Sequence, residues 1–198
     1  MQEKKENILM LLVMKLKNRY IYIYIMKHIE HIIIPTLGRC DKQITYNNLP
    51  NKYQDITKFV VQQHEFDIMN NKYPGKVLCL PENIKSIAPT REWIFNNFND
   101  TIFWVFDDDL DFVFKRPNKE EGSKWITRSM NELDFDIIFN EYIDHSIEIG
   151  YHYGALSTTW IIPEEKHYPT RENYRIMTNV FYNGPEIPRD LEWFTIIK

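Results

Sequence analysis

Three adjacent carboxylates, Asp107, Asp108 and Asp109, are the side chains best suited to chemistry here, because they directly follow the apolar run TIFWVF. Neighbouring negative charges repel one another, and this costs free energy unless a cation or a proton neutralises them. A hard divalent cation with oxygen ligands would do so, and it would leave positions open for substrate phosphates. Because side chains alternate along an extended chain, we expect Asp107 and Asp109 to share the cation and Asp108 to face the other way.

Two arginines are candidates to bind such phosphates. A guanidinium group presents a fixed fork of donors that matches phosphate oxygens. Arg39 follows a turn at the end of a predicted strand, and Arg91 lies in the first turn of a predicted helix, where backbone N–H groups could add donors. Each arginine could instead pair with a surface carboxylate, and Glu92 stands next to Arg91.

Around these residues, the sequence alternates between short apolar strands and helices. Strands are expected over 29–35, 56–62, 76–80, 101–106 and 155–162, and helices over 41–48, 64–71, 88–98 and 125–142. Asp41 is expected to cap the first helix, and Pro89 suits the first turn of the third. This alternation predicts an α/β fold with a sheet covered on both faces.

In such a sheet, ligands bind at the carboxyl ends of the strands. Three polar features are predicted to collect there: the loop Pro35-Thr36-Leu37-Gly38-Arg39, the region of Glu65, and the aspartate triplet at 107–109. Their convergence is the main indication of a functional site.

Length and composition set the class of protein. The 198 residues suit one domain, and a hydrophobic content of 43% excludes wholesale disorder. A net charge of −4 argues against a protein that coats nucleic acid, but not against an enzyme that meets DNA through a local basic patch. Cys40 and Cys79 have no CxxC spacing. Two cysteines in a chain of this length are expected either to be free in a reducing compartment, the cytoplasm (the host cytoplasm for a viral protein), or to form one disulfide.

The N-terminal 25 residues allow two interpretations. They are either an extension outside a working domain of residues 26–198, or an ordinary helix followed by an edge strand. The apolar runs at 8–13 and 20–26 are separated by Lys15, Lys17 and Arg19, so no membrane span is expected.

The polar motifs, taken in order, resemble a known family. The series Pro35-Thr36-x-Gly38-Arg39, Val60-Val61-x-x-x-Glu65, Thr90-Arg91 and Asp107-Asp108-Asp109 looks like that of GT-A-fold glycosyltransferases. It is closest to the phage-type TET-associated glycosyltransferases of DNA hypermodification, and it covers roughly residues 29–114. The resemblance implies a single GT-A-like, Rossmann-like α/β/α sandwich with a mostly parallel mixed sheet.

The resemblance also implies a reaction. The donor would be a nucleotide-sugar, usually UDP-linked, and Mn²⁺ or Mg²⁺ would bind Asp107 and Asp109 of a DxD-type motif. The residues implied to bind the donor are Pro35, Thr36, Gly38, Arg39, Glu65, Thr90, Arg91 and Asp108. For the phage-type group, the implied acceptor is a hydroxymethylated pyrimidine in DNA.

One feature of the family is not evident in this sequence. Such enzymes carry a second acidic motif, which supplies the catalytic base in inverting members, near a late helix. Either Asp190 or Glu192 takes this part, or the chain ends before the motif and the protein is a catalytically incomplete nucleotide-binding protein. Both residues could equally be a capping turn and a solvated charge.

Two further interpretations concern the residues around the triplet. A HAD-type phosphohydrolase also places aspartates after an apolar strand, but near the start of the chain, and here the triplet is mid-chain and is followed by Leu110. A basic stretch comes after the triplet, and it either follows a DNA backbone or is a solvated loop. Its members are Lys115, Arg116, Lys119, Lys124 and Arg128.

Overall fold

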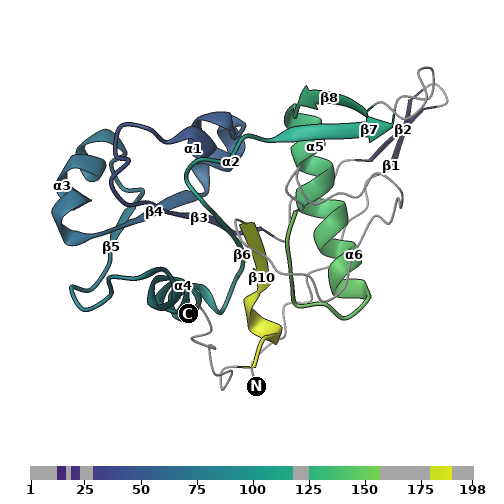
Figure 1. The fold of residues 1–198 in the computed structure, drawn as a ribbon. Coiled ribbons are helices and arrows are strands. Elements are labelled where there is room, and N and C mark those ends of the chain that lie inside the picture. Colours follow the sequence, from purple (N-terminus) through teal and green to yellow (C-terminus); the bar gives the residue numbers. More distant parts are fainter. Residues whose placement is uncertain (1–12, 17–18, 23–28, 118–124, 157–178, 189–198) are drawn as a thin grey trace.

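The computed structural model describes residues 13–16, 19–22, 29–117, 125–156 and 179–188. Its centre is a six-stranded sheet in the order β5-β4-β3-β6-β10-β9 (Figure 1). The strands are β3 (His31–Pro35), β4 (Thr57–Val61), β5 (Val77–Cys79), β6 (Ile102–Phe106), β9 (Tyr153–Gly154) and β10 (Asn179–Asn183). The first four run parallel, and β10 is antiparallel to both of its neighbours. This confirms the predicted Rossmann-like α/β fold with a mostly parallel mixed sheet.

The central strands are apolar because both faces of the sheet are covered. Ile32, Ile33 and Ile34 of β3 all have 0% exposure, although successive side chains point to opposite faces. In β6, Phe103 to Phe106 are likewise buried. Continuous apolar runs of this kind are typical of parallel strands in a three-layer protein.

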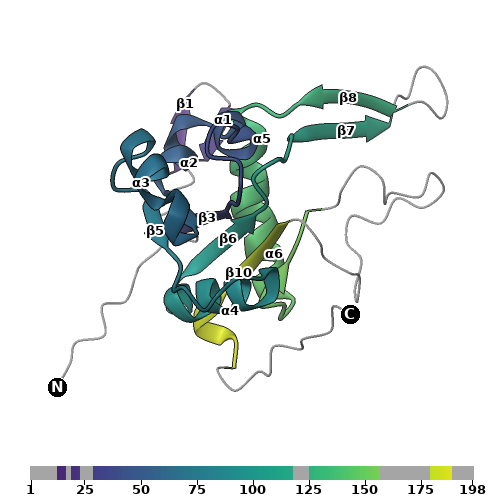
Figure 2. The ribbon, with the colours of Figure 1, turned by 60° about the vertical axis from the view of Figure 1, so that its left-hand side comes forward.

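Helices cover the two faces of the sheet. The bounds are α1 (Ile44–Asn48), α2 (Asn51–Asp55), α3 (Gln63–Lys72), α4 (Ile87–Phe98), α5 (Glu132–Ile137) and α6 (Ile143–Glu148), with a π-helical turn at Ile138–Tyr142 between the last two. Ile94 and Phe95 of α4 pack with Phe103 on one face. Phe135 and Phe139 pack with residues of the opposite face, and Figure 2 shows α4 and the α5–α6 helix on opposite sides of β6 and β10.

Two predicted helices differ from the structure. The first begins at Ile44, and the residue before it is Gln43 rather than the predicted cap Asp41. The Gln43 side chain makes no cap hydrogen bond, since it bonds Thr36 and the Arg39 carbonyl instead. The helix predicted over 125–142 is wrong in its first part. Residues Trp125–Ser129 form β8, which pairs antiparallel with β7 (Val113–Pro117). The helix starts only after Asn131, which forms a capping box with Asp134.

The strand predicted over 155–162 is shifted. Residues 153–154 form β9, residues 155 and 156 are irregular, and residues 157–162 lie outside the described residues. The short helix α2 and the strand β10 were not predicted.

The N-terminal region contributes a separate pair of strands. β1 (Val13–Leu16) and β2 (Arg19–Tyr22) pair antiparallel with each other, and within the described ranges neither joins the six-stranded sheet. The described residues there form neither a helix nor an edge strand of that sheet. The start of the working domain at residue 26 stays a prediction. No helix in the described part of the chain is long and apolar enough to cross a membrane.

Candidate active site

A pocket of about 350 Å³ lies at the carboxyl ends of the parallel strands. The side chains that line it come from the end of β3 and the loop after it, from the end of β4, from the segment between β5 and α4, from the first turn of α4 and from the loop after β6. They include Pro35, Thr36, Leu37, Arg39, Val60, Gln62, Leu80, Lys85, Ser86, Ile87, Thr90, Asp107, Asp108 and Asp109. The loop at 35–39 and the aspartate triplet therefore meet at the strand ends, as the sequence predicts. The pocket volume is within the range of small-molecule sites.

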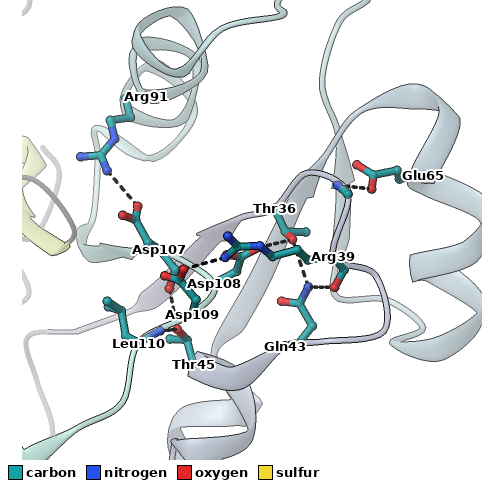
Figure 3. Close-up of polar contacts among 11 residues, drawn as sticks. Thr36, Arg39, Gln43, Thr45, Glu65, Arg91, Asp107, Asp108, Asp109 and Leu110 are labelled. Carbon is teal, nitrogen blue, oxygen red and sulfur yellow. Dashed lines mark hydrogen bonds and ion pairs between the residues drawn. The ribbon is translucent and has the colours of Figure 1, made fainter.

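Asp108 connects the loop after β3 to the loop after β6. The Thr36 hydroxyl donates to Asp108 Oδ2 over 2.5 Å, and Arg39 Nη1 donates to Asp108 Oδ1 over 2.7 Å (Figure 3). Asp108 is only 7% exposed, so both of its oxygens depend on these partners for hydrogen bonding. Its role in this arrangement is to hold Thr36 and Arg39.

Arg39 also contacts Asp109. The same Nη1 atom lies 2.7 Å from Asp109 Oδ2, and the two side chains are 46% and 50% exposed. Hydrogen bonding to Asp109 and the charge of Asp108 raise the pKa of Arg39 above its usual range. Because solvent screens an exposed ion pair, the Arg39–Asp109 contact contributes little to stability and both groups remain accessible to a ligand.

Asp107 has a different partner and environment. Its Oδ1 atom lies 3.0 Å from Arg91 Nη2. Burial raises the pKa of the Asp107 carboxyl above its usual value, and the charge of Arg91 opposes the shift, while Asp109 and Asp108 add to it. Ionised Asp107 is therefore disfavoured by its surroundings, and a nearby cation would relieve this cost.

The expected alternation of the three aspartates is wrong. Residues 108 and 109 lie in a turn rather than an extended strand. Asp108 and Asp109 consequently meet on Arg39, whereas Asp107 turns toward Arg91. The assignment of a metal to Asp107 and Asp109 stays a prediction.

The residues of the pocket can supply some, but not all, of the ligands of Mn²⁺ or Mg²⁺. Asp107 and Asp109 both line the pocket and supply the carboxylate oxygens that these ions prefer. Within the described ranges, no three His, Cys, Asp or Glu side chains form a ready-made metal cluster. A cation here would thus need phosphate oxygens and water to complete its coordination, as Mg²⁺ commonly does in proteins.

Glu65 and Gly38 support the site without lining it. Gly38 adopts a φ of +72°, and its N–H donates to Glu65 Oε1 over 2.6 Å. Cys40 Sγ donates to the same oxygen, whereas Oε2 of the buried Glu65 has no hydrogen-bond partner in the described structure. These contacts fix the turn that presents Arg39. Glu65 therefore supports the loop after β3 without reaching the pocket.

Thr90 and Arg91 also differ in whether they line the pocket. Thr90 lines the pocket, and its hydroxyl donates to the Ser86 carbonyl over 2.9 Å. Arg91 does not line the pocket, but it contacts Asp107, which does. Among the predicted donor-binding residues, Pro35, Thr36, Arg39, Thr90 and Asp108 line the pocket.

Sequence reasoning missed two buried polar residues at the start of α1. Gln43, 1% exposed, donates to Thr36 Oγ1 over 3.0 Å and to the Arg39 carbonyl over 2.9 Å. Thr45, 0% exposed, contacts the backbone of the aspartate triplet. The only sequence signal was polarity in a short helix. The predicted catalytic residues Asp190 and Glu192 lie outside the described residues.

Comparison with known proteins identifies the family. The family model described as TET-Associated Glycosyltransferase matches residues 30–192. The chain is 24% identical to the Beta-glucosyl-HMC-alpha-glucosyl-transferase of Enterobacteria phage T6 over 157 residues, which is 76% of this chain and 54% of that protein. The protein of the same name from Enterobacteria phage T2 is 23% identical over the same shares. No solved structure matches.

In open, mostly parallel α/β sheets, ligands bind at the carboxyl ends of the strands, and this is where the pocket with Arg39 and the aspartate triplet lies. The chain belongs to the TET-associated glycosyltransferase family. It spans about half the length of the curated relatives that it matches.

Proposed function

We propose that this protein is a metal-dependent glycosyltransferase that moves a sugar from a UDP-linked donor to a hydroxymethylated pyrimidine in DNA. One observation carries the proposal: Arg39 and the aspartate triplet, which are 68 or more positions apart in sequence, meet in one pocket. Family membership supports sugar transfer, and the pocket chemistry supports a charged phosphate donor.

The charged part of the pocket would bind the donor diphosphate. Arg39 offers its guanidinium fork to phosphate oxygens, and Asp108 with Thr36 keeps that fork in place. Asp107 and Asp109 would hold Mn²⁺ or Mg²⁺, which neutralises negative charge on the leaving diphosphate. Arg91 orients the Asp107 carboxylate through their 3.0 Å contact.

The apolar part of the pocket would bind the nucleoside. Leu37 and Ile87 are 60% and 55% exposed, and both line the pocket. Val60 and Leu80 add further apolar surface. Ligand pockets typically combine such a lining with a few polar groups, so a base and a ribose would lie against these side chains.

The acceptor and the catalytic base complete the proposal. The phage relatives carry the name Beta-glucosyl-HMC-alpha-glucosyl-transferase, which favours a modified pyrimidine, bare or already glucosylated, as the acceptor. In an inverting reaction, Asp190 or Glu192 would take the proton from the attacking hydroxyl as general base.

Mass spectrometry of the DNA product tests this function. The protein is incubated with UDP-glucose, Mn²⁺ and DNA that contains hydroxymethylcytosine, either bare or already glucosylated, with unmodified DNA and EDTA as controls. We expect a gain of one hexose per modified base only with Mn²⁺ and modified DNA. Nucleotide binding without hexose transfer would favour a catalytically incomplete nucleotide-binding protein, and transfer in EDTA would contradict the metal requirement.

A further inference from the structure

Thr45 of α1 makes three hydrogen bonds to the backbone around the aspartate triplet. Its hydroxyl donates to the Asp107 carbonyl over 2.5 Å and accepts from the Leu110 N–H over 2.8 Å. Its own N–H donates to the Asp108 carbonyl over 3.1 Å. Figure 3 shows Thr45 beside Asp109 and Leu110. A single residue thus holds the turn from residue 107 to residue 110.

The chemistry of this contact requires a hydroxyl. Thr45 has 0% exposure, so water cannot replace a lost partner. A hydroxyl group can donate and accept at the same time, which lets one side chain bond a carbonyl and an N–H that are three residues apart. Valine has nearly the same shape but can do neither, and it would leave the Asp107 carbonyl and the Leu110 N–H without these partners.

The neighbouring contacts of α1 extend this effect. Asn48 Nδ2 lies 3.3 Å from the Leu110 carbonyl, and Gln43 donates to Thr36 and to the Arg39 carbonyl on the other loop. The short helix therefore contacts both loops of the pocket. Thr45 is its contact with the loop that carries the carboxylates.

We propose that Thr45 is a positioning residue that fixes the turn of the aspartate triplet, so that Asp107 and Asp109 present their carboxylates to a divalent cation and a nucleotide diphosphate. The inference rests on the proposed function, since it assigns a role in the same site. Thr45 itself does not line the pocket. Its effect is on the direction of the carboxylates, which a shift of about 1 Å would spoil.

A matched control separates positioning from ordinary stability. Thr57, at the start of β4, is also 0% exposed, and its hydroxyl donates to the Tyr53 carbonyl over 2.7 Å. Thr57→Val removes a buried hydroxyl away from the pocket. Thr45→Ser keeps the hydroxyl but removes a methyl group, so it separates the hydrogen bonds from the packing.

The experiment is calorimetric titration of UDP in the presence of Mn²⁺, with urea unfolding of each variant in parallel. We expect Thr45→Val to weaken UDP binding about tenfold or more, and Thr45→Ser and Thr57→Val to stay within about threefold of the wild type. Unchanged binding in Thr45→Val would overturn the proposal. Equal losses of UDP affinity in Thr45→Val and Thr57→Val would also overturn it. A large loss of UDP affinity in Thr45→Ser would overturn it as well, and this variant provides the test if Thr45→Val does not fold.

Amide hydrogen exchange provides a measurement that needs no ligand. If the wild type binds neither Mn²⁺ nor UDP, the proposed function fails, but exchange of the Leu110 amide still reports on Thr45. We expect Thr45→Val to speed exchange at Leu110 about tenfold more than at the β6 amides. Acceleration by the same factor at Leu110 and in β6 would mean that Thr45 only stabilises the fold, and the inference would be wrong.

Discussion

Arg39 Nη1 lies 2.7 Å from Asp108 Oδ1, although the two residues are 69 positions apart. The same nitrogen lies 2.7 Å from Asp109 Oδ2, so one guanidinium group serves two carboxylates of the triplet. A cation that binds these carboxylates must compete with Arg39. A diphosphate that enters with the cation offers the guanidinium new oxygens, so cation and nucleotide should bind best together.

Removal of the Arg39 charge should affect the two ligands in opposite directions. In Arg39→Gln, we expect Mn²⁺ alone to bind at least as tightly as in the wild type, because a competing cation is gone. UDP in the presence of Mn²⁺ should bind about tenfold more weakly, because the phosphate fork is lost. Calorimetric titration measures both. Arg128→Gln removes another arginine that is ion-paired to an aspartate, Asp134, away from the pocket lining, and should change neither affinity.

Neutralisation of Asp109 should abolish the response to metal. In the wild type, UDP should raise the Tm only when Mn²⁺ or Mg²⁺ is present. Asp109→Asn keeps the shape of the side chain but removes its charge, and should lose this shift. Asp111→Asn is the matched control, since Asp111 is exposed and does not line the pocket. A shift that survives in Asp109→Asn would place the metal on other residues.

The raised pKa of Asp107 predicts a pH dependence with a definite sign. Its folded-state pKa lies above the ordinary 3.8, so the folded protein retains this proton more tightly than the unfolded chain. The contribution of Asp107 to stability is therefore present below pH 3.8 and is lost as the pH rises through the raised value. Urea unfolding should show that the stability of the wild type relative to Asp107→Asn falls across this window. A rising difference would contradict the assignment.

The same titration should control cation binding. Because Mn²⁺ binds the ionised carboxylate, its affinity should increase as the pH rises through the pKa of Asp107. Titrations of Mn²⁺ at several pH values above 3.8 measure this increase. We expect a weaker pH dependence in Asp107→Asn, whereas an identical dependence would show that another group is titrating.

Two glycines with the same backbone conformation allow a matched test of the Arg39 loop. Gly38 and Gly75 have φ values of +72° and +74°, and a Cβ atom at either would meet nothing within 4 Å. Alanine at either position should cost about 1 kcal/mol, because L-residues resist this conformation. Only Gly38→Ala should also weaken UDP binding, since the turn at Gly38 presents Arg39. Equal UDP affinity in the two variants would argue against that role.

Much of the parallel sheet could be predicted from the sequence. β3, β4, β5 and β6 begin and end within two residues of the predicted bounds. The reason is that each is a short apolar run buried on both faces, which is a local signal. β10 was missed, since its place is set by antiparallel pairing with β6, more than 70 positions earlier in the chain.

The β7–β8 hairpin and part of the site could not be predicted for the same reason, because long-range contacts determine them. Trp125–Ser129 joins an apolar pattern that continues into a true helix, and only pairing with β7 identifies it as a strand. The pocket loops could be predicted because strand ends collect at one edge. The buried partners Gln43 and Thr45 could not, because their importance depends on contacts with distant loops.

Anomalous scattering from Mn²⁺ in crystals grown with UDP tests the central claim most directly. The account predicts one strong manganese peak within coordination distance of Asp107 or Asp109 and of the UDP diphosphate, with Arg39 turned from Asp109 toward a phosphate oxygen. A UDP molecule bound elsewhere, or bound in this pocket without a manganese peak while Arg39 still pairs with Asp108 and Asp109, would contradict it.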